Sequence, residues 1–98
     1  MKVIYTHQGI PFAWESSKAA INQQKHRVAF EVACEVFFDP FLQRDEDEFA
    51  DGELRERVVG MTENWQLFYV VYTLRDDSIR LISARPATRQ ERKMYETQ

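Results

Sequence analysis

The chain has 98 residues, 44% of them hydrophobic and 30% charged, and its formal net charge is −3 at pH 7. This length predicts one domain over residues 1–98 with a single core, and the composition is typical of a folded globular protein. The negative charge argues against a general nucleic-acid coat protein. The single cysteine, Cys34, excludes an internal disulfide and a paired-thiol metal or redox motif.

No stretch of the sequence has the length and apolar character of a signal peptide or a membrane-spanning helix. A lone cysteine also suits a reducing compartment. We therefore expect a cytoplasmic protein that has no contact with membranes.

The N-terminal quarter of the chain predicts a strand and a helix. Residues 2–7 alternate and are rich in β-formers, and Gly9 and Pro11 then interrupt the pattern. A helical composition follows, from residue 15 or 16 to His26. The helix has one face formed by residues at steps of four, four and three: Trp14, Lys18, Asn22 and Lys25.

A second helix is predicted directly after the first, because apolar residues recur at helical spacing. Asp39-Pro40 should end this helix, since the residue before a proline disfavours the helical conformation. Residues 41–53 then read as a short extended piece followed by an acidic connection that ends near Gly52. The apolar stripe of the second helix consists of Phe30, Ala33, Cys34, Phe37 and Phe38.

The C-terminal half predicts three strands and a helix. Residues 54–63 and 65–75 are two strands, and the second is apolar on both alternating faces, as expected for a central strand. Residues 79–85 form the last strand. Thr88 and Glu91 then have the spacing of a capping box that opens a C-terminal helix. The order β-α-α-β-β-β-α indicates an α+β fold: a mostly antiparallel sheet of about four strands, two N-terminal helices and one C-terminal helix.

Charge is unevenly distributed along the chain. Residues 31–56 carry ten acids against two arginines, a balance of −8, whereas residues 75–93 carry six bases against three acids, a balance of +3. Neighbouring strands could bring four guanidinium groups to one face of the sheet, where phosphate would be a natural anion for them. Ion pairs with Glu53, Glu56 and Glu91 are the alternative. The four arginines are Arg55, Arg57, Arg80 and Arg85.

Metal-binding patterns are weak in this sequence. His7 has no companion at metal-ligand spacing, and the acidic run at 45–48 lacks the spaced ligands and the glycine of a calcium loop. We expect no metal and no cofactor. From the local sequence alone, Lys25-His26 is the polar C-terminal end of a helix, where a charged histidine interacts favourably with the helix dipole.

The combination of these motifs resembles the BrnT family of type II toxins over nearly the whole chain. The resemblance rests on the segments "FAWESSKAAINQQKHRVAFEVACEVFFDP", "GELRERVVGM" and "VVYTLRDDSIRLISARPATRQERKMYE". It implies a RelE-like fold, RNA cleavage that inhibits translation, and a toxin–antitoxin hetero-oligomer with a ribbon-helix-helix antitoxin, BrnA. Two positions depart from the family's usual "KHGVSF": Arg27 replaces a glycine suited to a left-handed helix end, and Ala29 replaces a serine suited to capping the next helix.

Metal-independent RNA cleavage needs a base for the 2′-hydroxyl, cations for the phosphoryl group and an acid for the leaving oxygen. Read with the resemblance, the chain is a metal-independent endoribonuclease in which His26 acts as base or acid near neutral pH. Aromatic rings would stack on bases of single-stranded RNA. The candidate catalytic residues are Lys25, His26, Glu53, Arg57 and Arg85. The candidate RNA-binding residues are Trp14, Lys18, Tyr72, Arg80 and Arg89.

Two other functions are compatible with the same residues. The arginines could hold RNA or a protein partner without chemistry, in a binding module. A small acid–base enzyme acting on a metabolite would require a deep pocket, and the sequence has no glycine-rich phosphate loop to support one.

Overall fold

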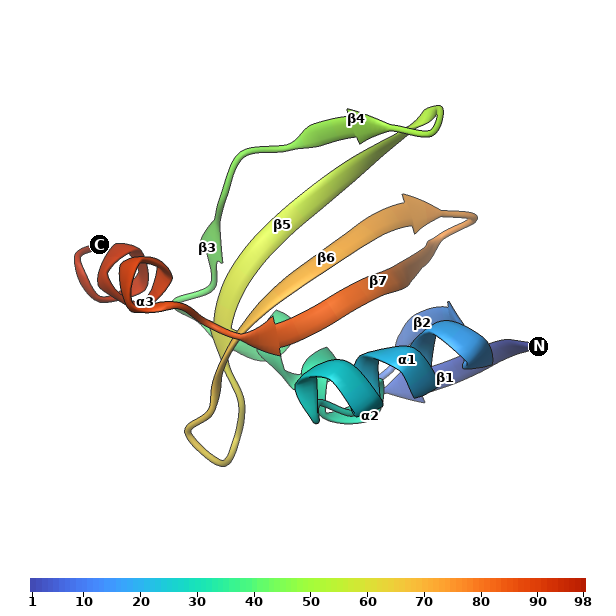
Figure 1. The fold of residues 1–98 in the computed structure, drawn as a ribbon, viewed down its shortest axis with the longest axis horizontal. Coiled ribbons are helices and arrows are strands. Elements are labelled where there is room, and N and C mark those ends of the chain that lie inside the picture. Colours follow the sequence, from blue (N-terminus) through green and yellow to red (C-terminus); the bar gives the residue numbers. More distant parts are fainter.

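The computed structural model describes residues 1–98 as a strongly curved sheet flanked by helices (Figure 1). The strands are β1 (Lys2–His7), β2 (Ile10–Glu15), β3 (Gln43–Arg44), β4 (Glu48–Ala50), β5 (Glu53–Met61), β6 (Leu67–Arg75) and β7 (Ser78–Pro86). The helices are α1 (Ser16–His26), α2 (Phe30–Ala33), the 3-10 helix η1 (Cys34–Phe38) and α3 (Arg89–Glu96).

The sheet has seven strands in the order β1-β2-β7-β6-β5-β3, and β4 pairs with β5 beside this path. β2 and β7 run parallel, whereas the other pairs are antiparallel. The α+β sheet is therefore mixed, and the expectation of a mostly antiparallel sheet of about four strands is wrong. β6 lies between β5 and β7, which confirms that it is a central strand.

The missed strand is β2, at a place where glycine and proline suggested a break. Gln8 and Gly9 both have positive φ, 49° and 82°, so they form the two-residue turn that suits the twist of a β-hairpin. Pro11 lacks an N–H, but β2 pairs with β7 only at Phe12 and Ala13. The proline thus lies outside the paired part of that edge, where strands tolerate it.

The expected pair of full N-terminal helices is also wrong. α1 ends at His26 as predicted, but the second helix is a single α-helical turn, α2, that tightens into η1. Gly60 of β5 shows how closely η1 crosses the sheet, because a Cβ atom there would lie 2.8 Å from the Cβ of Val36. Asp39 has an extended backbone and ends η1, in agreement with the predicted stop at Asp39-Pro40.

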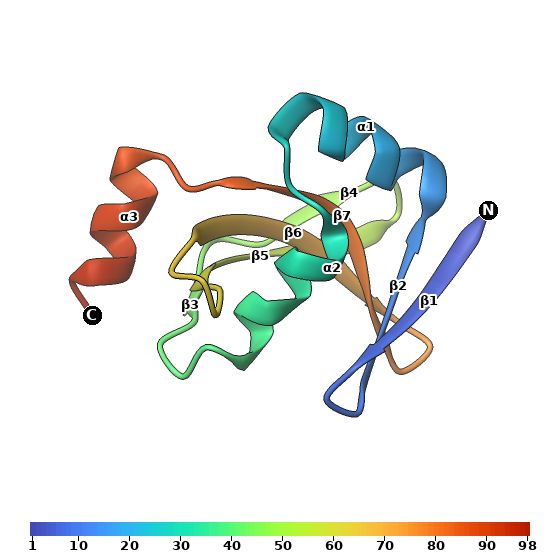
Figure 2. The ribbon, with the colours of Figure 1, turned by 90° about the horizontal axis from the view of Figure 1, so that it is seen from below.

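The two faces of the sheet bury different clusters. On one face, residues from β2, β5, β6 and β7 pack against α2 and η1 in a core of 13 buried side chains that includes Phe12, Trp14 and Phe30. On the other face, Val59, Leu67 and Tyr69 pack beneath Met94 and Tyr95 of α3. α3 lies at one end of the sheet and the β1–β2 hairpin at the other (Figure 2).

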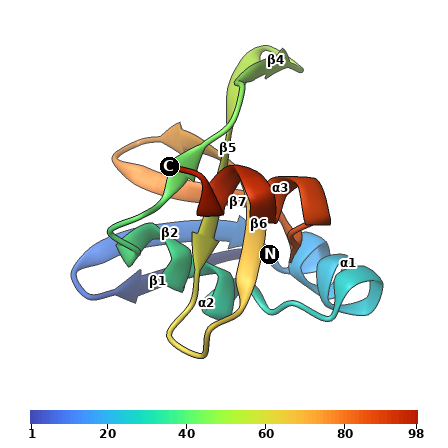
Figure 3. The ribbon, with the colours of Figure 1, turned by 90° about the vertical axis from the view of Figure 1, so that its left-hand side faces the viewer.

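Local sequence signals define the ends of the outer elements. Thr88 accepts a hydrogen bond from the Glu91 N–H, and the Glu91 carboxylate accepts one from the Thr88 N–H, which confirms the predicted capping box. β4 and the start of β5 project away from the rest of the molecule (Figure 3). No helix is both long enough and apolar enough to cross a bilayer.

Candidate active site

The register of the central strands brings arginines from two strands to one face of the sheet. Arg57 lies opposite Val71, which lies opposite Ser83, and in the next row Tyr69 lies opposite Arg85. Side chains alternate between faces along each strand. Along β7 a register shift just before Ser83 reverses this alternation, so Arg80, opposite Thr73, lies on the same face as Arg85. The face opposite the large core carries the four residues that we call the arginine face: Arg55, Arg57, Arg80 and Arg85.

Carboxylates from the acidic region already bind part of this face. Arg57 donates a hydrogen bond to Glu48 of β4, and Arg55 donates one of 3.0 Å to Asp51. Glu48 of β4 and Asp51 of the turn after it are therefore counter-ions for two of the four arginines. An RNA phosphate would have to displace the Glu48 carboxylate to reach Arg57.

Arg85 is held in place from two directions. Its two terminal nitrogens donate hydrogen bonds of 2.8 Å to the two carboxylate oxygens of Glu91, and its guanidinium lies 4.3 Å from the centre of the Tyr69 ring. The bond to Glu91 raises the pKa of Arg85. Burial opposes the charge on Glu91, but hydrogen bonds from Arg85 and from the Thr88 N–H outweigh it and lower the pKa of Glu91. Arg85 is thus a fixed cation at the C-terminal end of β7.

Lys25 and His26 line a small hollow between α1 and β7. Its volume is about 160 Å³, and its other polar walls are Lys18, Asn22 and Ser83. Lys18 and Lys25 come from the same helix as His26, and Ser83 faces them from the strand. The hollow therefore places an imidazole, two ammonium groups and a hydroxyl within reach of one small ligand group.

A bulge in β7 shapes the floor of this hollow. Val71 pairs with Ser83 and Tyr72 pairs with Leu81, so Ile82 is an extra residue that has no partner on β6. Ile82 also lines the hollow. Bulges of this kind re-aim side chains and are frequent beside active sites.

Asn22 fixes α1 against the edge of β7. Its amide nitrogen donates to the carbonyl oxygens of Val28 and Ala84 at 2.9 and 2.8 Å, and its amide oxygen accepts from the Ala84 N–H at 3.0 Å. The side chain is buried, so all three bonds are shielded from water. Asn22 therefore pairs with β7 as a neighbouring strand would, and it ties the turn after His26 to the same strand.

The hollow and the arginine face meet at Ser83. This residue lines the hollow and belongs to the row that ends in Arg57, two strands away. Arg85 lies two residues further along β7 on the same side. Of the predicted catalytic residues, Lys25 and His26 thus line the hollow, and Arg57 and Arg85 lie on the face of the sheet to which Ser83 belongs.

Two predicted RNA-binding aromatics lie in the core instead. Trp14 is only 2% exposed and packs edge-to-face against Phe30, with ring centres 5.6 Å apart. Tyr72 packs in the same way against Phe37 at 5.0 Å. Neither ring is accessible for stacking on a base, because both are closed in by other aromatic side chains.

The remaining predicted residues lie at other places. Glu53 begins β5 and accepts a hydrogen bond of 2.8 Å from Arg75 at the end of β6, four residues along the strand from Arg57. Arg80 lies on the arginine face further down β7, and Arg89 is exposed at the first turn of α3. Glu53 is therefore not brought to the hollow.

Sequence reasoning assigned no role to Asn22 and Ser83. For Asn22 there was a usable signal, since asparagine is a poor former of helix interiors and its position there suggests a tertiary contact. For Ser83 and the bulge at Ile82 there was none, because a bulge depends on the register between two strands. No group of three or more histidine, cysteine, aspartate or glutamate residues could hold a metal ion.

Comparison with protein families gives a match over residues 14–91 to the ribonuclease toxin BrnT of type II toxin–antitoxin systems. The chain belongs to the BrnT family. The match includes α1, the arginine face and the capping box of α3, so it covers every element that builds the hollow. A BrnT member is a ribonuclease toxin, and a type II system pairs such a toxin with an antitoxin.

Among solved structures, the fold is similar to that of the Brucella abortus ribonuclease toxin, BrnT. The two chains superpose with a TM-score of 0.52 at 17% identity, over 78% of this chain and 94% of the other. At this identity the likeness supports the BrnT fold alone. No curated protein sequence matches the chain.

Proposed function

We propose that this BrnT family toxin cleaves single-stranded RNA without a bound metal ion, and that the cleavage inhibits translation. One observation carries the proposal: the hollow that holds Lys25 and His26 opens at Ser83 onto a face that holds Arg57 and Arg85. A group able to transfer protons thus lies next to cations able to hold a phosphate.

His26 is the proton-transfer group in this proposal. It exchanges a proton with the 2′-hydroxyl or with the leaving 5′-oxygen, because imidazole can serve as base or acid near neutral pH. Lys25 stabilises the charge that develops on the phosphoryl oxygens. Asn22 and the Ile82 bulge hold this corner rigid, and rigidity matters because small displacements of reacting groups slow catalysis strongly.

The arginines bind the RNA backbone. A bidentate guanidinium fits phosphate as it fits carboxylate, so Arg85 would exchange Glu91 for a phosphate, and Arg57 would exchange Glu48. Lys18, Arg80 and Arg89 extend the cationic surface on either side. Trp14, Tyr72 and Glu53 have no part in the proposed site, since the rings are buried and the carboxylate is bound to Arg75.

The same ion pairs favour a second candidate function. Because Arg55, Arg57 and Arg85 already bind carboxylates, the face could hold RNA or a protein without chemistry. A binding module of this kind would retain RNA and leave it whole. In either case the antitoxin would be a ribbon-helix-helix protein of the BrnA type, forming a hetero-oligomer with this chain in the cytoplasm.

The test is cleavage of single-stranded RNA by the purified protein with and without EDTA. We expect EDTA to have no effect and His26→Gln to slow cleavage by roughly 10²–10⁴-fold, the usual share of a positioned acid or base. Glutamine retains hydrogen-bonding groups but cannot titrate, so it separates proton transfer from helix capping. His7→Gln, at the chain's other histidine, is the matched control and should retain activity.

Three results would refute parts of this proposal. Loss of cleavage in EDTA that added metal restores would refute metal independence. A His26→Gln variant that melts like the wild type and cleaves at the wild-type rate would remove His26 from the mechanism. RNA that is bound tightly but left whole by the wild type would favour the binding module.

A further inference from the structure

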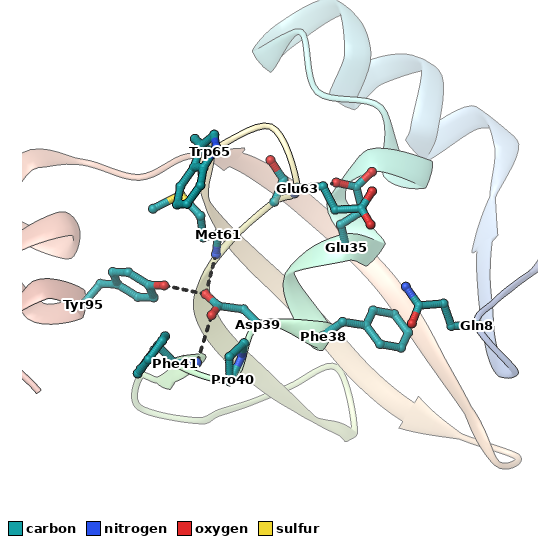
Figure 4. A pocket seen from close by; sticks show the side chains of 11 residues that line it. Gln8, Glu35, Phe38, Asp39, Pro40, Phe41, Met61, Glu63, Trp65 and Tyr95 are labelled. Carbon is teal, nitrogen blue, oxygen red and sulfur yellow. Dashed lines mark hydrogen bonds between the residues drawn. The ribbon is translucent and has the colours of Figure 1, made fainter.

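A second concave surface, lined by other residues than the hollow, lies between η1, the β5–β6 hairpin and α3 (Figure 4). It has a volume of about 520 Å³ and is formed by η1, the turn before β3, the β5–β6 hairpin and the last turn of α3, with Gln8 of the β1–β2 turn at its edge. We call it the aromatic groove, after its apolar walls: Phe38, Phe41, Met61, Trp65 and Tyr95.

Asp39 holds the walls of the aromatic groove in place. One of its carboxylate oxygens accepts hydrogen bonds from the Met61 N–H at 2.8 Å and the Tyr95 hydroxyl at 2.6 Å, and the other accepts from the Phe41 N–H at 2.9 Å (Figure 4). Burial and the bond to Asp39 raise the pKa of Tyr95 to about 12, so its hydroxyl stays a donor. The groove is therefore preformed, and a ligand need not order it first.

Tryptophan at position 65 does not favour the stability of the fold. It is the last of the three residues, 63–65, in the turn that the Thr62–Gln66 hydrogen bond closes between β5 and β6. Its φ of 63° lies in the left-handed region, where glycine is strongly favoured and a bulky side chain is an outlier. Its side chain is 83% exposed and gains little from burial. Phe41, on the facing wall, is 64% exposed. A strained and exposed tryptophan indicates a role in binding, since strain of this kind concentrates at functional sites.

The charge around the groove indicates what it binds. Its lining includes Glu35, Asp39 and Glu63 and no lysine, arginine or histidine. Asp39 is fully engaged, but the Glu63 carboxylate and one oxygen of Glu35 accept no hydrogen bond from the chain. An acidic rim repels RNA phosphates and attracts lysine and arginine. The occupant is therefore an apolar segment of a protein flanked by basic residues.

We propose that the aromatic groove is the docking site of the antitoxin, which inserts an apolar side chain between Phe41 and Trp65 and pairs a basic residue with Glu35 or Glu63. The proposal rests on membership of a type II toxin family, which supplies the partner, and not on the cleavage mechanism. Tyr95 lies one helical turn from Glu91, the partner of Arg85. A segment anchored in the groove is thus close enough to continue along α3 towards the arginine face.

The experiment measures binding of the protein encoded next to this chain's gene to the purified full-length toxin, by calorimetry. Trp65→Gly removes the ring and supplies the residue that the turn prefers, so the variant should fold and melt at or above the wild-type temperature. We expect it to weaken binding by roughly 30-fold or more, as for a central aromatic anchor. Glu63→Lys should also weaken binding, and Ile4→Ala, an equally exposed apolar residue on β1, is the matched control.

The possible results separate this proposal from its alternatives. Unchanged affinity in Trp65→Gly, an equal loss in Ile4→Ala, or no binding of the neighbouring protein by the wild type would each overturn it. A wild-type dimer that Trp65→Gly converts to a monomer, with antitoxin affinity retained, would assign the groove to self-association instead. RNA cleavage should be the same in Trp65→Gly and the wild type, because the groove has no part in cleavage. The two proposals can therefore fail separately: a wild-type protein that binds the antitoxin through Trp65 but does not cleave RNA would refute only the proposed function.

Discussion

The arginine face and the aromatic groove differ in charge and in how each satisfies its own polar groups. On the arginine face, cations are paired with carboxylates from β4 and α3 that an anionic ligand could replace. In the groove, the one central carboxylate, Asp39, is saturated by the chain's own donors, and exposed aromatic rings remain open. The first surface is built to exchange ions, and the second to bury apolar area.

This difference would allow one small chain to bind RNA and a protein at separate places, as we propose. Phosphate contacts dominate RNA affinity, and they need accessible cations. Affinity between proteins resides mostly in a few desolvated aromatic or arginine anchors. The two regions have these two properties at separate places, so changes in one should leave the other intact.

The largest effect is expected at Asn22, which supports only the hollow. Asn22→Ala would leave the N–H and carbonyl of Ala84 and the carbonyl of Val28 without their partners. Unpaired buried groups of this kind should lower the free energy of unfolding by roughly 2–4 kcal/mol. Urea denaturation measures this, and RNA cleavage should fall below the level that the folded fraction accounts for.

Asn64→Ala is the matched control for that comparison. Asn64 is an exposed asparagine in the β5–β6 loop beside the groove, so its loss should change stability by less than roughly 0.5 kcal/mol. Antitoxin binding by folded Asn22→Ala protein should equal that of the wild type. If Asn22→Ala were as stable as Asn64→Ala, the strand-like pairing of Asn22 with β7 would be unimportant.

A smaller effect is expected for Arg85. Arg85→Ala removes one cation from the arginine face and should weaken RNA binding roughly tenfold, about the value of a charge-assisted hydrogen bond. It should also reduce the salt dependence, because each phosphate contact to a single strand contributes about 0.7 to the slope of log K against log salt. Filter binding at several salt concentrations measures both quantities.

Arg92→Ala is the control for Arg85, because Arg92 is an exposed arginine on α3 whose carboxylate contact, to Glu96, is 3.8 Å long. An equal loss of RNA affinity in Arg92→Ala and Arg85→Ala would mean that positive charge in general, and not the arginine face, holds RNA. Binding that strengthens with salt would show that phosphate contacts do not hold it.

The sequence predicted the local elements better than their assembly. α1, the stop at Asp39-Pro40 and the capping box of α3 depend on neighbouring residues, and their signals were correct. β2 was missed because its strand character depends on pairing with β1 and, in parallel, with β7. Long-range pairing of this kind leaves little trace in a short segment that contains a glycine and a proline.

The candidate site shows the same division. Lys25 and His26 were recognisable as a pair, and neighbouring strands do bring the arginines to one face, although Arg80 joins Arg85 there only because of the bulge in β7. The burial of Trp14 was not foreseen, because an aromatic residue suits a core as well as a binding surface. For Tyr72, the prediction of a central strand already indicated burial, and its assignment to RNA binding conflicted with that prediction. The groove was missed altogether, since its lining comes from five segments of the chain and only the left-handed turn at Trp65 makes them unusual.

The smallest effect concerns a second strained turn, at Arg27. Like Trp65, Arg27 is a non-glycine residue in the left-handed region, with a φ of 57° where the chain leaves α1. A left-handed conformation costs about 1 kcal/mol for a residue with a Cβ atom, so Arg27→Gly should raise the free energy of unfolding by about that amount. In a domain of this size, that corresponds to about 4–8 °C in a thermal melt.

Arg27→Ala separates the strain from the side chain, since alanine loses the guanidinium but keeps the Cβ atom. It should bring no gain in stability, whereas Arg27→Gly should gain. Both Arg27 variants should bind the antitoxin as the wild type does, because Arg27 lies in the turn beside the hollow and not in the groove. Trp65→Gly, by contrast, should gain stability and lose antitoxin binding. Equal melting temperatures for Arg27→Gly and Arg27→Ala would show that the left-handed turn carries no strain there, and the strain argument for Trp65 would then lose its closest parallel in the molecule.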